Sequence, residues 1–198
     1  MLRRVVGFRS FHPRSGRRWI STSREFMVTQ EPGSEACTRG AIATIVNTLR
    51  NQRLESIESV DEKLLAICEA YRRKGIDGLQ PALEERAARE IFQHWGLFVI
   101  PARYQAAQLI DPRVARSLIS TFNSGMYLST SQPPNNPPTM SHSLVATNVV
   151  IDSQTNAIRY EIYDPYPLRQ RNLNGMYELD ANGLLLQRFR TGLFVSRY

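Results

Sequence analysis

The chain has 198 residues, enough for one domain with its own core and too few for two ordinary domains. Its net charge of +7 is uneven: residues 1–24 hold seven arginines and no Asp or Glu, which leaves 18 basic and 18 acidic residues in 25–198. Nucleic-acid binding needs an excess of basic residues on the folded surface, and 25–198 has none. A membrane span needs about 18 apolar residues in a row, and the sequence has no such run. We therefore expect no nucleic-acid partner and no membrane-spanning segment.

Residues 1–24 are rich in Arg and Ser and poor in acid, as mitochondrial presequences are. The stretch Arg18-Trp19-Ile20-Ser21 resembles a presequence cleavage site. We expect a disordered basic leader outside the fold, followed by a single domain over 25–198. The leader predicts mitochondrial localisation; the alternatives are a disordered basic tail and the delivery signal of a secreted effector that enters a host cell.

Helical spacing of apolar residues predicts four helices in the first half of the chain: Cys37–Arg50, 60–74, 80–95 and one that begins at Asp111-Pro112. Ser59, with Glu62 three residues later, indicates a capping box for the second helix. Gly96 is a stop signal for the third helix. Residues 97–100 predict a short buried strand.

The second half of the chain is rich in β-branched and aromatic residues. It predicts strands over 125–130, 142–151, 157–163, 176–180 and 184–197. Hairpin turns are expected at 153–156 and 181–183. Four prolines and two asparagines exclude regular structure from 132–138, so we expect 131–140 to form a mobile rim beside the site. Helices followed by an antiparallel sheet predict an α+β fold.

The sequence has two cysteines and three histidines, so few residues could serve as a nucleophile and its base. Two cysteines are too few for a disulfide framework, and Cys68 lies among apolar residues of a predicted helix, as a core thiol does. Cys37 begins a predicted helix, where N–H groups and the helix dipole favour a thiolate. Of the three histidines, His12 lies in the leader and His94 is more typical of a packing or surface residue. His142, at the start of a predicted strand, suits the base that an activated cysteine needs.

Asp164 is the expected third member of this group. It ends the strand that follows the His142 strand, and a hairpin places the end of its second strand beside the start of its first. Asp164 should therefore lie next to His142 and hold its tautomer. Each of Cys37, His142 and Asp164 has a purely structural interpretation, but their joint occurrence on suitable elements favours a catalytic site.

The pattern of Gln30, a Gly-containing turn, Cys37 on a helix start, a His-led strand and a strand ending in Asp164-Pro165 resembles the papain-like cysteine peptidase superfamily. It is most similar to the C39-like peptidases and to papain-like secreted effector proteases. The resemblance implies a papain-like fold, a Cys37–His142–Asp164 triad, and Gln30 as donor to the oxyanion.

Family members often have a glycine beside the nucleophile and an aromatic residue after the histidine. This chain has Ala36 and Thr38 around Cys37, and Ser143 after His142. We expect a cysteine peptidase that works through an acyl-enzyme on a protein or peptide substrate, as a monomer and without a cofactor. Two alternatives remain: a glutamine deamidase or transglutaminase-like acyl transferase with the same triad, and a catalytically idle binding module on this fold.

Overall fold

The structure is a computed structural model that describes residues 8–12, 17–20, 25–76, 80–132, 141–166 and 175–197. Its elements, in chain order, are β1 (Phe8–His12), β2 (Arg17–Ile20), α1 (Cys37–Arg50), α2 (Ile57–Arg73), α3 (Gln80–His94), β3 (Phe98–Pro101), α4 (Ala106–Leu109), α5 (Pro112–Phe122), β4 (Gly125–Ser131), β5 (His142–Ile151), β6 (Ile158–Tyr163), β7 (Met176–Asp180), α6 (Ala181–Leu186) and β8 (Arg190–Ser196).

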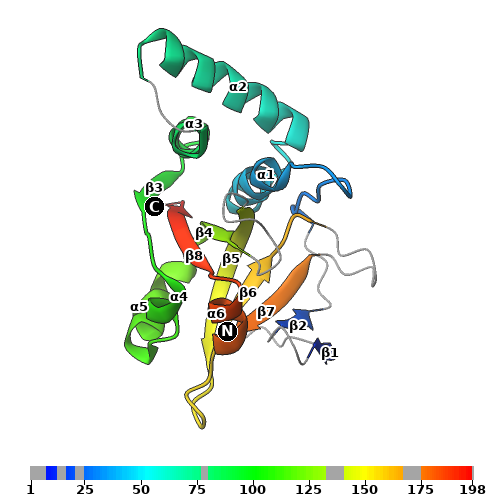
Figure 1. Cartoon of the computed structure of the whole chain (residues 1–198), viewed down its shortest axis with the longest axis vertical. Coiled ribbons are helices and arrows are strands. Elements are labelled where there is room, and N and C mark those ends of the chain that lie inside the picture. The colour runs from blue at the N-terminus through cyan, green and yellow to red at the C-terminus, as the bar shows by residue number, and fades with distance from the viewer. Residues whose placement is uncertain are drawn as a thin grey trace.

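A single antiparallel sheet forms the centre of the molecule (Figure 1). Its strand order is β7-β6-β5-β4-β8-β3, and β2 and then β1 extend it beyond β7. Helices α1 to α5 come before strands β4 to β8 in the chain. The predicted α+β class, with a helical part packed on an antiparallel sheet, is therefore confirmed.

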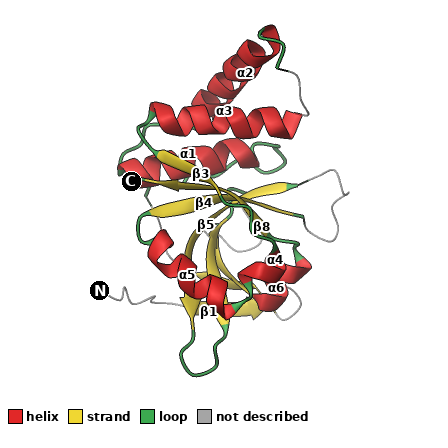
Figure 2. Cartoon of the chain, turned by 90° about the vertical axis from the view of Figure 1, so that its left-hand side faces the viewer, coloured by secondary structure: helices red, strands yellow, loops and turns green. Residues whose placement is uncertain are grey.

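Helices cover both faces of the sheet (Figure 2). Alternating residues of β5 show why: Val145 belongs to the apolar cluster under α1, α2 and α3, whereas Leu144 and Ala146 belong to the cluster that contains residues of α4, α5 and α6. Sheets buried on both faces are built from strands with apolar residues in succession. Two apolar cores thus hold β5 rigidly between the helical layers.

Helix α1 has the predicted bounds and its apolar stripe is buried: Ala41, Ile42, Ile45, Val46 and Leu49. Helix α2 begins three residues earlier than predicted, because the capping box joins Ser56 to Ser59 rather than Ser59 to Glu62. No helix among the described residues combines the length and apolarity that a bilayer crossing requires.

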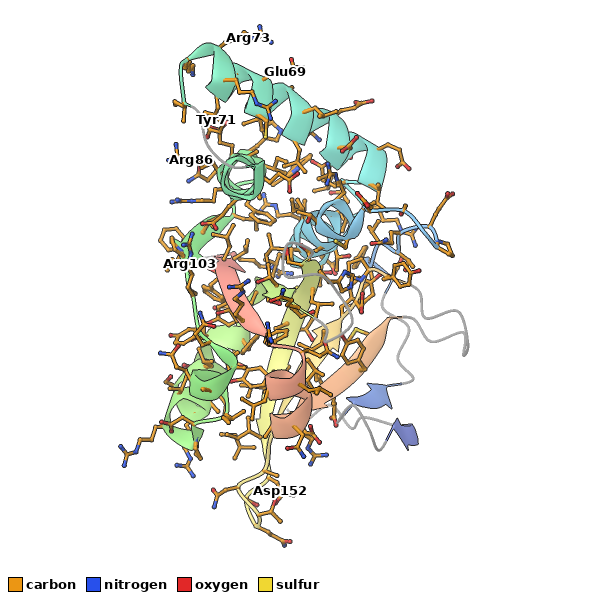
Figure 3. All side chains as sticks on the ribbon, viewed as in Figure 1. Glu69, Tyr71, Arg73, Arg86, Arg103 and Asp152 are labelled. Carbon is orange, nitrogen blue, oxygen red and sulfur yellow. The ribbon has the colours of Figure 1, made fainter. Side chains whose placement is uncertain are left out.

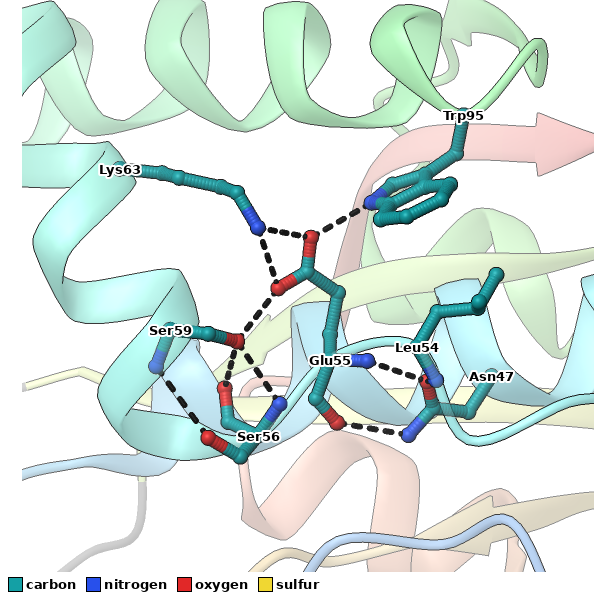
Figure 4. Close-up of polar contacts among 7 residues, drawn as sticks. All are labelled: Asn47, Leu54, Glu55, Ser56, Ser59, Lys63 and Trp95. Carbon is teal, nitrogen blue, oxygen red and sulfur yellow. Dashed lines mark hydrogen bonds and ion pairs between the residues drawn. The ribbon is translucent and has the colours of Figure 1, made fainter.

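A buried carboxylate, Glu55, links the first three helices (Figure 4). It accepts hydrogen bonds from Lys63 Nζ at 2.6 and 2.8 Å and from Trp95 Nε1 at 2.5 Å. The side chain of Asn47 in α1 binds the backbone of the same segment, with Nδ2 donating to the Glu55 carbonyl at 2.8 Å. Burial raises the pKa of Glu55, but the donors from Lys63, Ser59 and Trp95 outweigh it and lower the pKa overall. The network therefore ties the last turn of α1 to α2 and to the end of α3.

The connection from β7 to β8 differs from the prediction. The expected hairpin turn at 181–183 is wrong: the chain forms helix α6 there, and Asp180 caps it by accepting the Gly183 N–H at 2.8 Å. Strands β7 and β8 are separated by β6, β5 and β4, so a tight turn cannot join them. A turn sequence with an Asp before it serves equally well as a helix N-terminus.

Strand β3 lies at the sheet edge and pairs only with β8 among the described residues. Its predicted burial is wrong, because Phe98 is 55% and Ile100 44% exposed. An apolar run of four residues has no periodicity that separates a central strand from an edge strand.

The segment expected to be a leader contributes two short strands. In β2, Arg18 stands opposite Glu178 and Trp19 opposite Tyr177. Strand β7 would otherwise be an edge, and an edge pairs with any extended segment that reaches it. The domain boundary near residue 25 and the targeting role remain predictions. Residues 133–140 of the predicted rim lie outside the described part of the chain.

Candidate active site

The β5–β6 hairpin brings two predicted site residues to one end of the sheet. Its turn is tightened by Asp152, whose Oδ1 accepts the backbone N–H of Gln154 at 2.8 Å and of Thr155 at 2.9 Å. Figure 3 shows Asp152 at the far tip of the hairpin. His142 starts β5 and Asp164 follows β6, so both lie at the opposite end.

His142 and Asp164 are directly hydrogen-bonded. The His142 Nε2 atom lies 2.6 Å from Asp164 Oδ1, and Asp164 is only 4% exposed. Because Nε2 is bound to the carboxylate, the ring nitrogen left for another partner is Nδ1. The geometric expectation drawn from the hairpin therefore holds.

The backbone around Asp164 fixes the direction of its carboxylate. Oδ1 also accepts the Tyr166 N–H at 2.9 Å, and Oδ2 lies 3.5 Å from the Tyr177 hydroxyl. The Asp164 N–H donates to the Gly175 carbonyl at 2.8 Å. Gly175 has φ +66°, and a Cβ there would stand 2.2 Å from the Asp164 carbonyl oxygen, so only glycine fits.

Cys37 is the first residue of α1, and its N-cap is Ala36, whose side chain cannot accept a hydrogen bond. Polar N-caps stabilise helices by about 1 kcal/mol by binding the first N–H groups. Their absence here leaves the positive end of α1 directed at the Cys37 sulfur and at any anion that forms beside it.

Cys37 and His142 interact, and each shifts the pKa of the other. Burial raises the pKa of Cys37, but hydrogen bonds from the His142 ring and from the Ser143 backbone N–H outweigh it and lower the pKa below its usual value. Burial lowers the pKa of His142, but its hydrogen bonds with Asp164 and Cys37 raise it to about 10. Both shifts act in the same sense: they favour the proton on His142 and the thiolate form of Cys37.

Gln30 lies beside the segment that carries Asp164. Its backbone N–H donates to the Pro165 carbonyl at 2.8 Å, one residue after Asp164, and its side chain is buried with Gln30 3% exposed. The Nε2 group donates to the Ser34 carbonyl, and Oε1 has no hydrogen-bond partner among the described residues. An amide carries two N–H donors, so one remains for a further acceptor.

Two contacts at the site were not predicted from the sequence. The Thr38 and Ser143 hydroxyls lie 2.8 Å apart, and the Tyr166 ring meets the His142 ring edge-on with centroids 6.4 Å apart. The sequence gives one indication of the first contact: Thr38 directly follows Cys37, and Ser143 directly follows His142.

Cys68 and His94 belong to α2 and α3 and have surroundings of their own, as expected. Cys68 is 2% exposed in the core under α1, α2 and α3, and burial raises its pKa. His94 is exposed at the end of α3 and packs edge-on against Trp95. In the described part of the chain, no three His, Cys, Asp or Glu side chains gather as metal ligands.

The chain has likenesses among solved structures. No protein-family model matches the sequence, and no curated protein matches it. Among solved structures, the Pseudomonas avirulence protein AvrPphB is similar over 87% of this chain and 98% of its own, with 11% sequence identity and a TM-score of 0.47. A likeness of this size assigns neither a family nor an activity.

Proposed function

We propose that the chain is a papain-like cysteine hydrolase that cleaves amide bonds in protein or peptide substrates. The observation that supports this most is the hydrogen-bonded series in which Cys37 meets His142 and His142 Nε2 meets Asp164 Oδ1 at 2.6 Å. A lowered thiol pKa, an adjacent base and a carboxylate that orients the base are the requirements for a cysteine nucleophile.

In the first half-reaction the Cys37 thiolate attacks the carbonyl carbon and forms a C–S bond. The carbonyl electrons move to oxygen, and this oxyanion would accept the Cys37 backbone N–H and the second N–H of Gln30 Nε2. Collapse of the intermediate breaks the C–N bond. The leaving nitrogen takes the proton of the His142 imidazolium, which leaves a thioester and a neutral imidazole.

In the second half-reaction neutral His142 removes a proton from water, and the resulting hydroxide attacks the thioester. The C–S bond breaks and Cys37 leaves as the thiolate, while His142 is again protonated. Asp164 holds the ring with Nε2 toward the carboxylate in both halves. The side chains named above, the substrate and one water molecule account for every bond made and broken in this cycle.

The test joins covalent labelling to substrate profiling. A cysteine-directed peptide electrophile should add one equivalent to Cys37 by intact mass, and a peptide library should be cleaved by the wild-type protein. Cys37→Ala should abolish labelling and turnover, and His142→Ala should abolish turnover. Gln30→Ala should raise the barrier by about 3 kcal/mol, the usual worth of one oxyanion donor, while the thiol remains alkylatable.

Cys68→Ser is the matched control, because Cys68 is buried in the core and should not affect labelling or turnover. Release of ammonia from glutamine peptides without chain cleavage would assign the same triad to the deamidase or acyl-transferase alternative. A Cys37 thiol that labels no faster than an ordinary cysteine would remove the hydrolase proposal and leave the binding module.

A further inference from the structure

Two of the positions at which this chain departs from the papain-like pattern, Thr38 and Ser143, contact each other. Thr38 follows the nucleophile in α1 and Ser143 follows the base in β5, and their hydroxyl oxygens lie 2.8 Å apart. Ser143 is largely buried, and it stands on the sheet face that α1 covers, two residues from Val145 in the core under that helix. This half-buried hydroxyl pair joins a helix to a strand beside Cys37 and His142.

The direction of the Thr38–Ser143 hydrogen bond follows from a third partner. Thr38 directly follows Cys37 in α1, and its hydroxyl is one of the groups that lower the pKa of Cys37, which a hydroxyl does by donating to the sulfur. The single hydroxyl hydrogen of Thr38 is then used for the sulfur, so the Thr38 oxygen accepts the hydrogen bond from the Ser143 hydroxyl. Ser143 reaches the sulfur a second time through its own backbone N–H.

We propose that Thr38 and Ser143 are positioning residues that form a relay, Ser143 hydroxyl to Thr38 hydroxyl to Cys37 sulfur, which holds the thiolate in line with the His142 ring. Donors in series polarise one another, so the Thr38 donor is stronger when Ser143 backs it. The inference rests on the hydrolase proposed above and adds two residues to its site. His142 on β5 is the charged group that acts on the sulfur, and Asp164, after β6, acts on it through the His142 ring.

The test measures the pH dependence of Cys37 alkylation by iodoacetamide on the full chain, which needs no substrate. Thr38→Val removes the donor at nearly constant volume and should raise the midpoint by about half to one pH unit, the net worth of one hydrogen bond. Ser143→Ala keeps the backbone N–H and should raise the midpoint less. The double variant should match Thr38→Val alone, because the Ser143 hydroxyl acts only through Thr38. Thr38→Ser should restore the wild-type midpoint.

Thr147→Val is the matched control, since Thr147 lies further along β5 than Ser143 and its hydroxyl donates to the Glu161 carbonyl of β6. A Thr38→Val midpoint that moves no more than that of Thr147→Val overturns the proposal. Shifts of Thr38→Val and Ser143→Ala that add in full in the double variant overturn the relay. A relay confirmed in this way while the peptide library stays intact would refute the hydrolase alone.

Discussion

Cys37 and His142 should together make the activity of the proposed hydrolase depend on pH in two limbs, one for each residue. The thiolate forms as pH rises through the lowered pKa of Cys37, and the imidazolium is lost as pH approaches about 10. We expect kcat/KM to rise through the first value and fall through the second. Asp164→Asn removes the carboxylate that raises the His142 pKa, so the basic limb should move to lower pH.

This prediction is checked by pH profiles of kcat/KM for the wild type and Asp164→Asn on the best library peptide. Asp152→Asn is the control: Asp152 is also hydrogen-bonded by backbone N–H groups, but it lies at the far tip of the hairpin and should shift neither limb. A basic limb unmoved by Asp164→Asn would mean that the carboxylate does not control the ring.

At the scale of elements, the segment that ends β6 and the one that begins β7 form one backbone unit around Asp164. Gly175 and Gly75 both have positive φ, +66° and +69°, but a Cβ collides with the Asp164 carbonyl only at Gly175. Gly75→Ala should therefore cost about 1 kcal/mol for the left-handed backbone alone. Gly175→Ala should cost about 3 kcal/mol, because the backbone around Asp164 must also move.

Denaturant unfolding of both variants measures this difference, and the alkylation midpoint of Cys37 reports the site. Only Gly175→Ala should raise that midpoint, because displacement of Asp164 weakens its hold on His142. Equal losses of stability would show that the Asp164 carbonyl gives way without cost.

Local signals explain what was predictable from the sequence. The α1 stripe and the Asp111-Pro112 start of α5 depend on residues close in sequence, and His142 and Asp164 are joined by one hairpin. The Thr38–Ser143 contact depends on how a helix packs on a strand 105 residues later, which no periodicity encodes. The same reasoning covers α6, whose turn sequence fits a hairpin as well as a helix until the strand order is known.

At the scale of the whole molecule, the basic segment 1–24 holds none of the proposed site residues, but its strand β2 pairs with β7 in the sheet. Residues 1–30 fused to a fluorescent protein should enter mitochondria in eukaryotic cells, since an Arg-rich, acid-poor segment is the import signal. A fusion with the seven leader arginines changed to glutamine is the control and should stay cytosolic. A wild-type fusion that stays cytosolic would contradict the mitochondrial prediction and favour the secreted-effector alternative.

The distance along the chain between Thr38 and Ser143 has a consequence for synthesis. Cys37, the proposed nucleophile, emerges from the ribosome more than a hundred residues before His142, its proposed base, and a sheet of sequence-distant strands forms slowly. Until β5 and β6 dock on α1, Cys37 is an ordinary thiol without a proton acceptor, so a nascent or half-folded chain has no reactive sulfur to direct at its neighbours. In refolding experiments, the onset of fast alkylation should therefore come last and should time the closure of the sheet.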